Sequence, residues 1–389
     1  MSTLKGKFLH QLRADFPGLQ KEPLEDIVSD QLLSPFKVEL PASVLKQAQS
    51  FIEKIFAVRE TPAYKNHYQP QIEHRQLKDP GNKSIMMSYD FHVDDSGHLK
   101  LIEVNTNASF LALGHEMYKA HQVPLPVPDF SFAEVKRDIE LELRLNHHAV
   151  AAAIKTVITD ENPQDQRLYV EFLVYREMFK SWGWQCEVQD YRELFKTFTP
   201  DFIYNRHTDF FLSDPTSALL REKFLAQEVC LSPNPYEYLL LADKNRMVEW
   251  SKPGFFEALG VDSTTADFLR SCVPQSLDVH SGNIDEIWAN RKKYFFKPKN
   301  AFGSKQSYRG GTVSRKAFEA LPHDDTLAQE YIPAPEKEFE TPEGPQKFKY
   351  DLRCYAYQGR LQLVLARLYQ GQVTNLRTPY GGFACVSFV

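Results

Sequence analysis

The run Leu101-Ile102-Glu103-Val104-Asn105 follows closely after the run Ser88-Tyr89-Asp90-Phe91-His92. Residues 85–93 and 99–104 predict two strands joined by a tight turn. Alternate residues of a strand share one face, so Glu103 and Asn105 point together, and Asp90 on the partner strand can join them. Carboxylate and amide oxygens are the ligands that Mg²⁺ prefers in proteins. The two strands therefore predict a magnesium site.

The composition is that of a globular protein of two or three domains. The chain has 389 residues, of which 42% are hydrophobic and 25% charged, and it is rich in Phe and Tyr. Long disordered stretches are therefore not expected. The net charge is −5, whereas nucleic-acid-binding proteins usually carry a basic surface. We expect no nucleic-acid partner.

The cysteine pattern and the N-terminus favour a reduced, cytoplasmic enzyme. The five cysteines are far apart, with no spacing typical of a zinc site or a disulfide framework. The first 16 residues lack the apolar core of a signal peptide, and no apolar run reaches the about 18 residues that cross a membrane. We expect no membrane partner.

Hydrophobic periodicity predicts a mixed α/β or α+β architecture. Residues 42–58 have helical spacing. A helix at 166–182 lies between strands at 155–159 and 184–188, and a further strand is expected at 201–206.

Two proline-rich segments suggest domain boundaries. One is residues 122–130, and the other is Ser232-Pro233-Asn234-Pro235. They divide the chain into domains at 1–122, 130–235 and 236–389.

The strand Tyr294-Phe295-Phe296-Lys297-Pro298 ends by presenting a lysine. The loop that follows contains Gly303 and Ser304, and such a loop can bring backbone N–H groups against a phosphate while Lys297 adds a positive charge. The sequence is not a P-loop, because GxxxxGK[ST] is absent. Taken alone, the segment fits a surface turn as well as a phosphate site.

The neighbouring motifs resemble those of ATP-grasp enzymes. Asp243-Lys244 resembles the family's Asp-Lys motif, Leu327-Ala328-Gln329-Glu330-Tyr331-Ile332 resembles its hinge, and Tyr350-Asp351-Leu352-Arg353 resembles the strand that carries a carboxylate and an arginine. Residues 365–384, which include Arg367, resemble the next hairpin of ribosomal-protein glutamate ligases and glutathione synthetases.

The resemblance implies a nucleotide site for ATP and Mg²⁺. Lys244 and Lys297 would bind the phosphates, helped by the loop with Gly303 and Ser304. Arg353 and Arg367 would act in catalysis on the transferring phosphoryl group. The adenine would contact Gln329, Glu330, Tyr331 and Ile332, the ribose would contact Asp351, and the metal ligands would be Asp90, Glu103 and Asn105.

The order of these motifs implies a circular permutation. In ATP-grasp ligases the Asp and Glu-x-Asn set comes last, but here it precedes Lys244. The chain resembles the circularly permuted, glutathionylspermidine synthase-like branch of the family, with residues 130–235 as a small α/β pre-ATP-grasp domain. Residues 85–105 and 350–385 are then expected in one antiparallel sheet, with Val389 near the helix at 42–58.

The family implies an ATP-dependent carboxylate–amine ligase that forms an amide through an acyl phosphate. Its partners would be a small-molecule or peptide carboxylate and an amine. Two alternatives stay open at this point: an ATP-grasp kinase acting on a small molecule, and a nucleotide-binding protein without turnover.

Other polar residues are less specific. His147-His148 fits a solvated helix face, and His92 fits a structural histidine. Asn205-Arg206-His207, at the end of a strand, is a weaker candidate for binding an acidic substrate.

Overall fold

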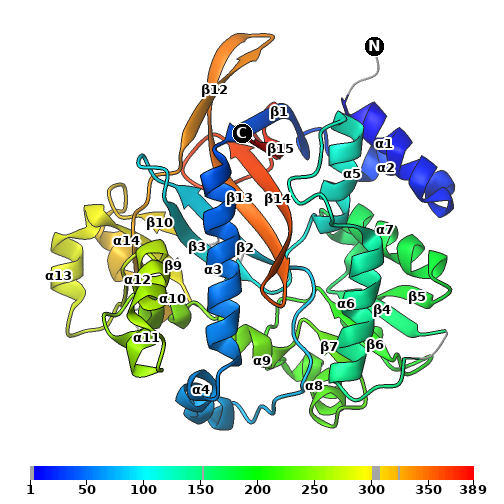
Figure 1. The fold of residues 1–389 in the computed structure, drawn as a ribbon, viewed down its shortest axis with the longest axis horizontal. Coiled ribbons are helices and arrows are strands. Elements are labelled where there is room, and N and C mark those ends of the chain that lie inside the picture. Colours follow the sequence, from blue (N-terminus) through cyan, green and yellow to red (C-terminus); the bar gives the residue numbers. More distant parts are fainter. Residues whose placement is uncertain (1–3, 151–152, 300–306, 323–324) are drawn as a thin grey trace.

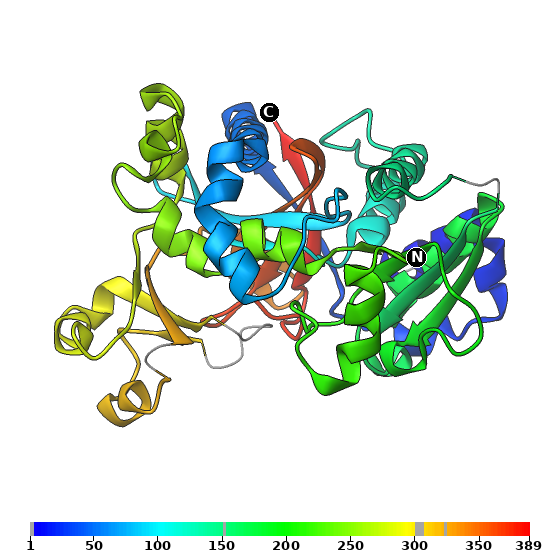
Figure 2. The same ribbon diagram turned by 90° about the horizontal axis from the view of Figure 1, so that it is seen from below.

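The computed structural model describes residues 4–150, 153–299, 307–322 and 325–389. Three sheets and the helices around them make up the fold (Figure 1). The largest sheet has seven strands, and the two four-stranded sheets lie on opposite sides of its middle (Figures 1 and 2). The expected mixed α/β architecture is confirmed.

The large sheet joins strands from both ends of the sequence. Its order is β1-β15-β14-β13-β2-β3, with β12 paired to β13, and every pairing is antiparallel except β1 with β15. In the pairing of β13 with β2, Arg353 lies opposite Asp90. The expected neighbourhood of residues 85–105 and 350–385 is therefore confirmed. The strands are β1 (Leu33–Leu40), β2 (Met87–Val93), β3 (Leu99–Asn105), β12 (Glu336–Thr341), β13 (Gly344–Tyr357), β14 (Arg360–Tyr369) and β15 (Gly382–Phe388).

Alternating apolar residues bury both faces of this sheet. In β14, Val364 and Ala366 belong to one hydrophobic core, whereas Leu363 and Leu365 belong to another. Helix α3 (Ala42–Glu60) packs in the first core and α5 (Leu111–His121) in the second. A Cβ on Gly114 of α5 would lie 2.6 Å from Leu365, so this glycine permits the close approach of helix and strand.

The second sheet is parallel, in the order β5-β4-β6-β7. Its first two strands lie on either side of α7 in the sequence, as the strand–helix–strand pattern predicts. The strands are β4 (Lys155–Asp160), β5 (Gln185–Asp190), β6 (Phe202–Asn205) and β7 (Cys230–Ser232), and the helices are α6 (Phe132–Leu145), α7 (Tyr169–Ser181) and α8 (Ala218–Leu225).

The third sheet is antiparallel, in the order β10-β9-β11-β8. Its strands are β8 (Ser276–Asp278), β9 (Tyr294–Pro298), β10 (Tyr308–Arg309) and β11 (Thr326–Glu330). The helices of this part of the chain are α9 (Pro235–Glu237), a π-helical turn (Tyr238–Ala242), α10 (Asn245–Trp250), α11 (Phe255–Ala258), α12 (Ser263–Cys272), α13 (Ile284–Ala289) and α14 (Arg315–Glu319).

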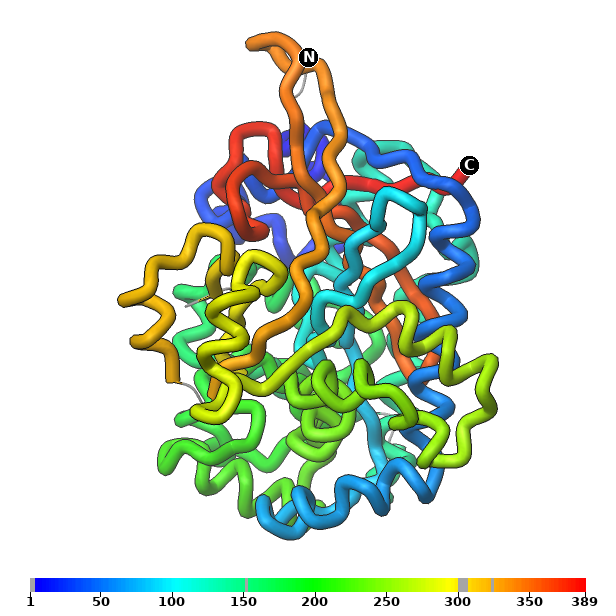
Figure 3. Tube along the Cα trace, turned by 90° about the vertical axis from the view of Figure 1, so that its left-hand side faces the viewer, coloured from blue at the N-terminus to red at the C-terminus, as the bar shows by residue number. Residues whose placement is uncertain are grey.

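A hairpin formed by β12 and β13 projects beyond the rest of the molecule (Figure 3). Within this hairpin Phe339 stacks on Phe36 of β1, with ring centroids 4.5 Å apart. The remaining helices are α1 (Leu4–Asp15), α2 (Leu24–Ile27) and α4 (Pro62–His74), and short 3-10 helices cover Pro17–Lys21, Pro163–Asp165, Tyr191–Glu193, Pro215–Ser217 and Arg291–Lys293.

The end of the chain lies against α3, as expected. The carbonyl oxygen of Val389 accepts a hydrogen bond of 2.9 Å from the backbone N–H of Ala42, the first residue of that helix. The contact agrees with the geometry of a permuted chain, while the permutation itself stays a prediction.

Within the described ranges, no helix combines the length and apolar character needed to cross a membrane.

Gly382, at the start of β15, is expected to be sensitive to substitution. Its φ is +104°, and a Cβ there would lie 2.5 Å from the carbonyl oxygen of Gln31. We expect Gly382→Ala to lower the free energy of unfolding by more than the about 1–3 kcal/mol of backbone strain alone. Gly371→Ala is the matched control, because its φ is +103° and no atom of the described residues lies within 4 Å of the added Cβ. Equal losses for the two variants in urea denaturation would contradict this prediction.

Candidate functional site

A cavity of about 490 Å³ lies where the large sheet meets the β8–β11 sheet. All the predicted site residues that the structure describes contribute to its wall, except Asp90. Gly303 and Ser304 lie outside the described residues. The predicted residues that line the cavity are Glu103, Asn105, Lys244, Lys297, Gln329, Glu330, Tyr331, Ile332, Asp351, Arg353 and Arg367.

Asp90 lies behind the cavity wall and is only 1% exposed. Arg353 donates to both of its carboxylate oxygens, from Nε at 2.9 Å and from Nη2 at 2.7 Å, and Arg367 donates from Nη2 at 2.8 Å. Ser88 Oγ and Asn105 Nδ2 add bonds of 3.2 Å each. Burial raises the pKa of Asp90, but the two arginines outweigh it and lower this pKa to about 2.

Arg367 is held by a second carboxylate as well. Arg367 Nε donates to Asp351 Oδ1 at 2.7 Å, and Thr374 Oγ1 donates to Asp351 Oδ2 at 2.5 Å. The order Asp351–Arg367–Asp90–Arg353 alternates charges along the cavity wall. Among the described residues, Nη1 of each arginine has no hydrogen-bond partner. Both guanidiniums therefore keep a donor for an anion in the cavity.

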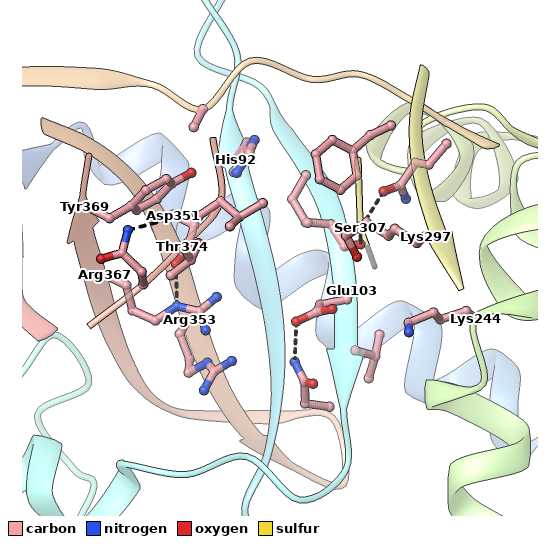
Figure 4. A pocket seen from close by; sticks show the side chains of 18 of the residues that line it. His92, Glu103, Lys244, Lys297, Ser307, Asp351, Arg353, Arg367, Tyr369 and Thr374 are labelled. Atoms are coloured by element: carbon pink, nitrogen blue, oxygen red, sulfur yellow. Dashed lines mark hydrogen bonds and ion pairs between the residues drawn. The ribbon is translucent and has the colours of Figure 1, made fainter. Parts of the chain in front are cut away.

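Glu103 and Asn105 leave β3 on the same face, as predicted. Asn105 Nδ2 donates to Glu103 Oε1 at 3.3 Å, and Glu103 lies between the two arginines and the two lysines (Figure 4). A carboxylate beside an amide oxygen suits a hard cation. Asp90 fits this donor set less well, because its oxygens already accept five hydrogen bonds. No cluster of three His, Cys, Asp or Glu side chains able to hold a metal occurs among the described residues.

Two lysines face Glu103 from the other side of the cavity. Lys297 Nζ donates to the backbone oxygen of Ile102 at 2.9 Å and to Gln329 Oε1 at 2.8 Å, and Lys244 Nζ donates to the backbone oxygen of Pro298 at 2.8 Å. Burial lowers the pKa of Lys297 to about 8, although the Glu103 carboxylate acts in the opposite direction. Burial also lowers the pKa of Lys244.

The predicted hinge lies at the end of β11. Gln329 is buried, and its Nε2 has no hydrogen-bond partner in the part of the chain that the structure describes, so it offers a donor in the cavity wall. Glu330 is exposed, and its carboxylate accepts a 3.2 Å hydrogen bond from the backbone N–H of Gln275. Both residues line the cavity.

Some residues of this cavity were not predicted. His92 was expected to be structural, but it lines the cavity with Nδ1 3.0 Å from the backbone oxygen of Ile332. Its position two residues after Asp90 was the available signal. Thr374 and Tyr369 also line the cavity; both lie in the segment that resembles the family's next hairpin, but neither was given a role. Arg206, the weaker candidate, does not line it and donates instead to the backbone oxygen of Asn107.

The lowered pKa of Lys297 predicts how the free energy of unfolding changes with pH. Between pH 8 and 10.5 the unfolded chain, with an ordinary lysine pKa of 10.5, binds one proton more than the folded chain. Linkage then stabilises the folded state as the pH rises. We expect the free energy of unfolding of the wild type, relative to that of Lys297→Met, to increase over this window by roughly 1.4 kcal/mol per pH unit. Denaturant titrations from pH 7 to 10 measure it, and a constant difference would exclude a depressed pKa.

Comparison with known protein families gives no match for this sequence, and no curated protein matches it. Among solved structures, the chain is similar to the glutathione synthetase-like effector GSS30 from Globodera pallida in its apo form. The TM-score is 0.58 at 14% sequence identity, and the match covers 99% of this chain and 97% of that one.

Two further solved structures are less similar. One is a putative γ-glutamylcysteine synthetase from Methylobacillus flagellatus KT, with a TM-score of 0.44, 9% identity and coverage of 84% of this chain and 83% of that one. The other is the ATP-grasp ligase PsnB complexed with precursor peptide PsnA2 and AMPPNP, with a TM-score of 0.30, 12% identity and coverage of 61% and 89%. The TM-scores of these two matches are too low to support an argument about the fold. The first match shows that the chain shares its mixed α/β fold, over nearly its whole length, with a glutathione synthetase-like protein.

Proposed function

We propose that the protein is an ATP-dependent carboxylate–amine ligase of the ATP-grasp type. The observation that carries the proposal is one cavity in which two lysines and two arginines surround Glu103. Phosphoryl transfer needs positive charge held in place around the phosphates more than it needs a protein nucleophile. The full-length likeness to a glutathione synthetase-like fold supports the same reaction class.

The order of motifs supports a circularly permuted member of the glutathionylspermidine synthase-like branch. In this proposal residues 1–122 and 236–389 together form the ATP-grasp domain, and residues 130–235 form the small pre-ATP-grasp domain. The pairing of β2 with β13 is the contact that such a rearrangement requires.

Each group in the cavity has a proposed task. Lys244 and Lys297 bind the ATP phosphates, while Gln329, Glu330, Tyr331 and Ile332 surround the adenine. Asp351 lies beside the ribose. Glu103 and Asn105 would hold Mg²⁺, whose charge offsets that of the phosphates.

The reaction then proceeds in two transfers. A carboxylate oxygen of the acid attacks the γ-phosphorus of ATP, the bond to ADP breaks, and the free Nη1 groups of Arg353 and Arg367 stabilise the charge on the phosphoryl oxygens. The amine then attacks the carbonyl carbon of the acyl phosphate and phosphate leaves, which forms the amide. The acid is a small molecule or a peptide.

Product analysis tests this reaction. Purified protein with MgATP is incubated with panels of carboxylates and amines, and ADP and amide are measured by a coupled assay and mass spectrometry. We expect ADP and amide in equal amounts only when acid and amine are both present. Lys297→Ala should weaken ATP binding about ten- to hundredfold, because it removes a charge-assisted contact. ADP formed with a phosphorylated hydroxyl compound and no amide would instead identify a kinase.

The roles of Asp90 and Glu103 can be separated. Asp90 was predicted as a metal ligand, but its hydrogen bonds support a role in orienting Arg353 and Arg367, with Glu103 as the main ligand. Glu103→Gln should weaken Mn²⁺ binding in the presence of AMPPNP about tenfold or more, because it removes a charged oxygen. Asp90→Asn should leave Mn²⁺ affinity within about threefold and lower kcat instead.

Electron paramagnetic resonance of bound Mn²⁺ gives the affinity without turnover. Equal losses of Mn²⁺ affinity in Glu103→Gln and Asp90→Asn would restore Asp90 as a ligand. Unchanged affinity in both variants would exclude a metal site on β3.

A further inference from the structure

His92 has a defined place on the large sheet, and the proposed function gives it no task. In the pairing of β2 with β13, Leu352 lies opposite Phe91, so the next step of this antiparallel register brings Asp351 opposite His92. Residues that lie opposite one another in such a pair share a face, with Cβ atoms roughly 4.5–5.5 Å apart. Both residues line the cavity (Figure 4). His92 and Asp351 are therefore neighbours in the cavity wall.

One hydrogen bond holds the ring of His92. Nδ1 lies 3.0 Å from the backbone oxygen of Ile332, at the end of the predicted hinge and 240 residues away in the sequence. A carbonyl oxygen only accepts, so Nδ1 is the donor. Among the described residues, the other ring nitrogen, Nε2, has no hydrogen-bond partner, and it is not sealed from solvent. Nε2 is therefore available to a ligand in the cavity.

Asp351 keeps acceptor capacity beside this ring. Each oxygen of its carboxylate already accepts one hydrogen bond, Oδ1 from Arg367 Nε at 2.7 Å and Oδ2 from Thr374 Oγ1 at 2.5 Å. An ionised carboxylate has about four lone-pair sites, so each oxygen can accept one hydrogen bond more. The cavity wall thus presents two adjacent groups that can bind hydroxyls, the His92 ring and the Asp351 carboxylate.

We infer that His92 Nε2 binds one of the two ribose hydroxyls of the nucleotide, next to the hydroxyl that contacts Asp351, and so selects ribonucleotides over deoxyribonucleotides. The ring contacts Ile332, proposed at the adenine, and lies opposite Asp351, proposed at the ribose. The adjacent hydroxyls on C2′ and C3′ match two polar groups that lie side by side. A hydroxyl can donate or accept, so the contact does not depend on the charge of the ring. The inference rests on the proposed function for the presence of a nucleotide.

A purely structural role of His92 would need only Nδ1, and two substitutions separate the two ring nitrogens. The amide nitrogen of an asparagine lies nearly where Nδ1 lies, so His92→Asn can keep the hydrogen bond to Ile332 while it removes the group at Nε2. The amide of a glutamine reaches nearly to the position of Nε2, so His92→Gln keeps a polar group toward the sugar. The inference predicts opposite behaviour of these two variants toward ribose hydroxyls.

Calorimetric titration with ATP, 2′-deoxy-ATP and 3′-deoxy-ATP, in the presence of Mg²⁺ and without acid or amine, tests the inference. The wild type should bind ATP about tenfold or more tightly than at least one analogue, because the missing hydroxyl leaves a polar group of the wall unpaired. In His92→Asn this preference should fall to about twofold or less. The analogue affected shows which hydroxyl lies at His92. His92→Gln should keep at least part of the preference.

His98→Asn is the matched control, because His98 lies in the turn between β2 and β3, is 68% exposed and does not line the cavity. It should bind all three nucleotides as the wild type does. An unchanged preference for ATP in His92→Asn, or equal binding of the three nucleotides by the wild type, would overturn the inference and leave the ligase proposal intact. A wild type that binds none of them would contradict the nucleotide site of the proposed function, and this inference with it.

Discussion

One buried carboxylate connects distant parts of the large sheet. Asp90 of β2 accepts hydrogen bonds from Arg353 of β13 and Arg367 of β14, although 263 and 277 residues separate it from them. A buried charge is tolerated only when it is paired, and loss of one partner typically costs about 3–5 kcal/mol. The same pairing fixes the direction of both guanidiniums. The sheet and the phosphoryl end of the cavity therefore depend on one network.

Local sequence patterns were sufficient to predict the strands that carry residues of the cavity wall. The alternation around Glu103 and Asn105 predicted β3 and the face on which both side chains lie, and Lys297 was predicted at the end of its strand. These inferences hold because strand periodicity is a property of a few neighbouring residues. The hydrogen-bond partners of each carboxylate could not be predicted in this way, because the register of β2 against β13 depends on residues from opposite ends of the chain. For this reason the pairing of Asp90 with two arginines was not predicted, while its role as a metal ligand stays a prediction.

The end of the cavity near α7 was harder to predict. Asn205-Arg206-His207 does lie at a strand end, as expected, but Arg206 lies outside the cavity wall and donates to the backbone oxygen of Asn107. Arg167 lines the cavity but stands in no motif, so no local sequence pattern marked it. The cavity therefore carries information about the ligand that the sequence alone does not.

The position of β15 bears on how the protein is made. This strand lies between β1 and β14, yet it follows every other strand of the sheet in the sequence. During synthesis, β1 and β14 thus leave the ribosome with unpaired edges that face one another, and unpaired edges are sites of aggregation. Phe383 of β15 also forms part of the cavity wall. A nascent chain therefore cannot complete this cavity before β15 has been translated, and the sheet stays open between β1 and β14 until then.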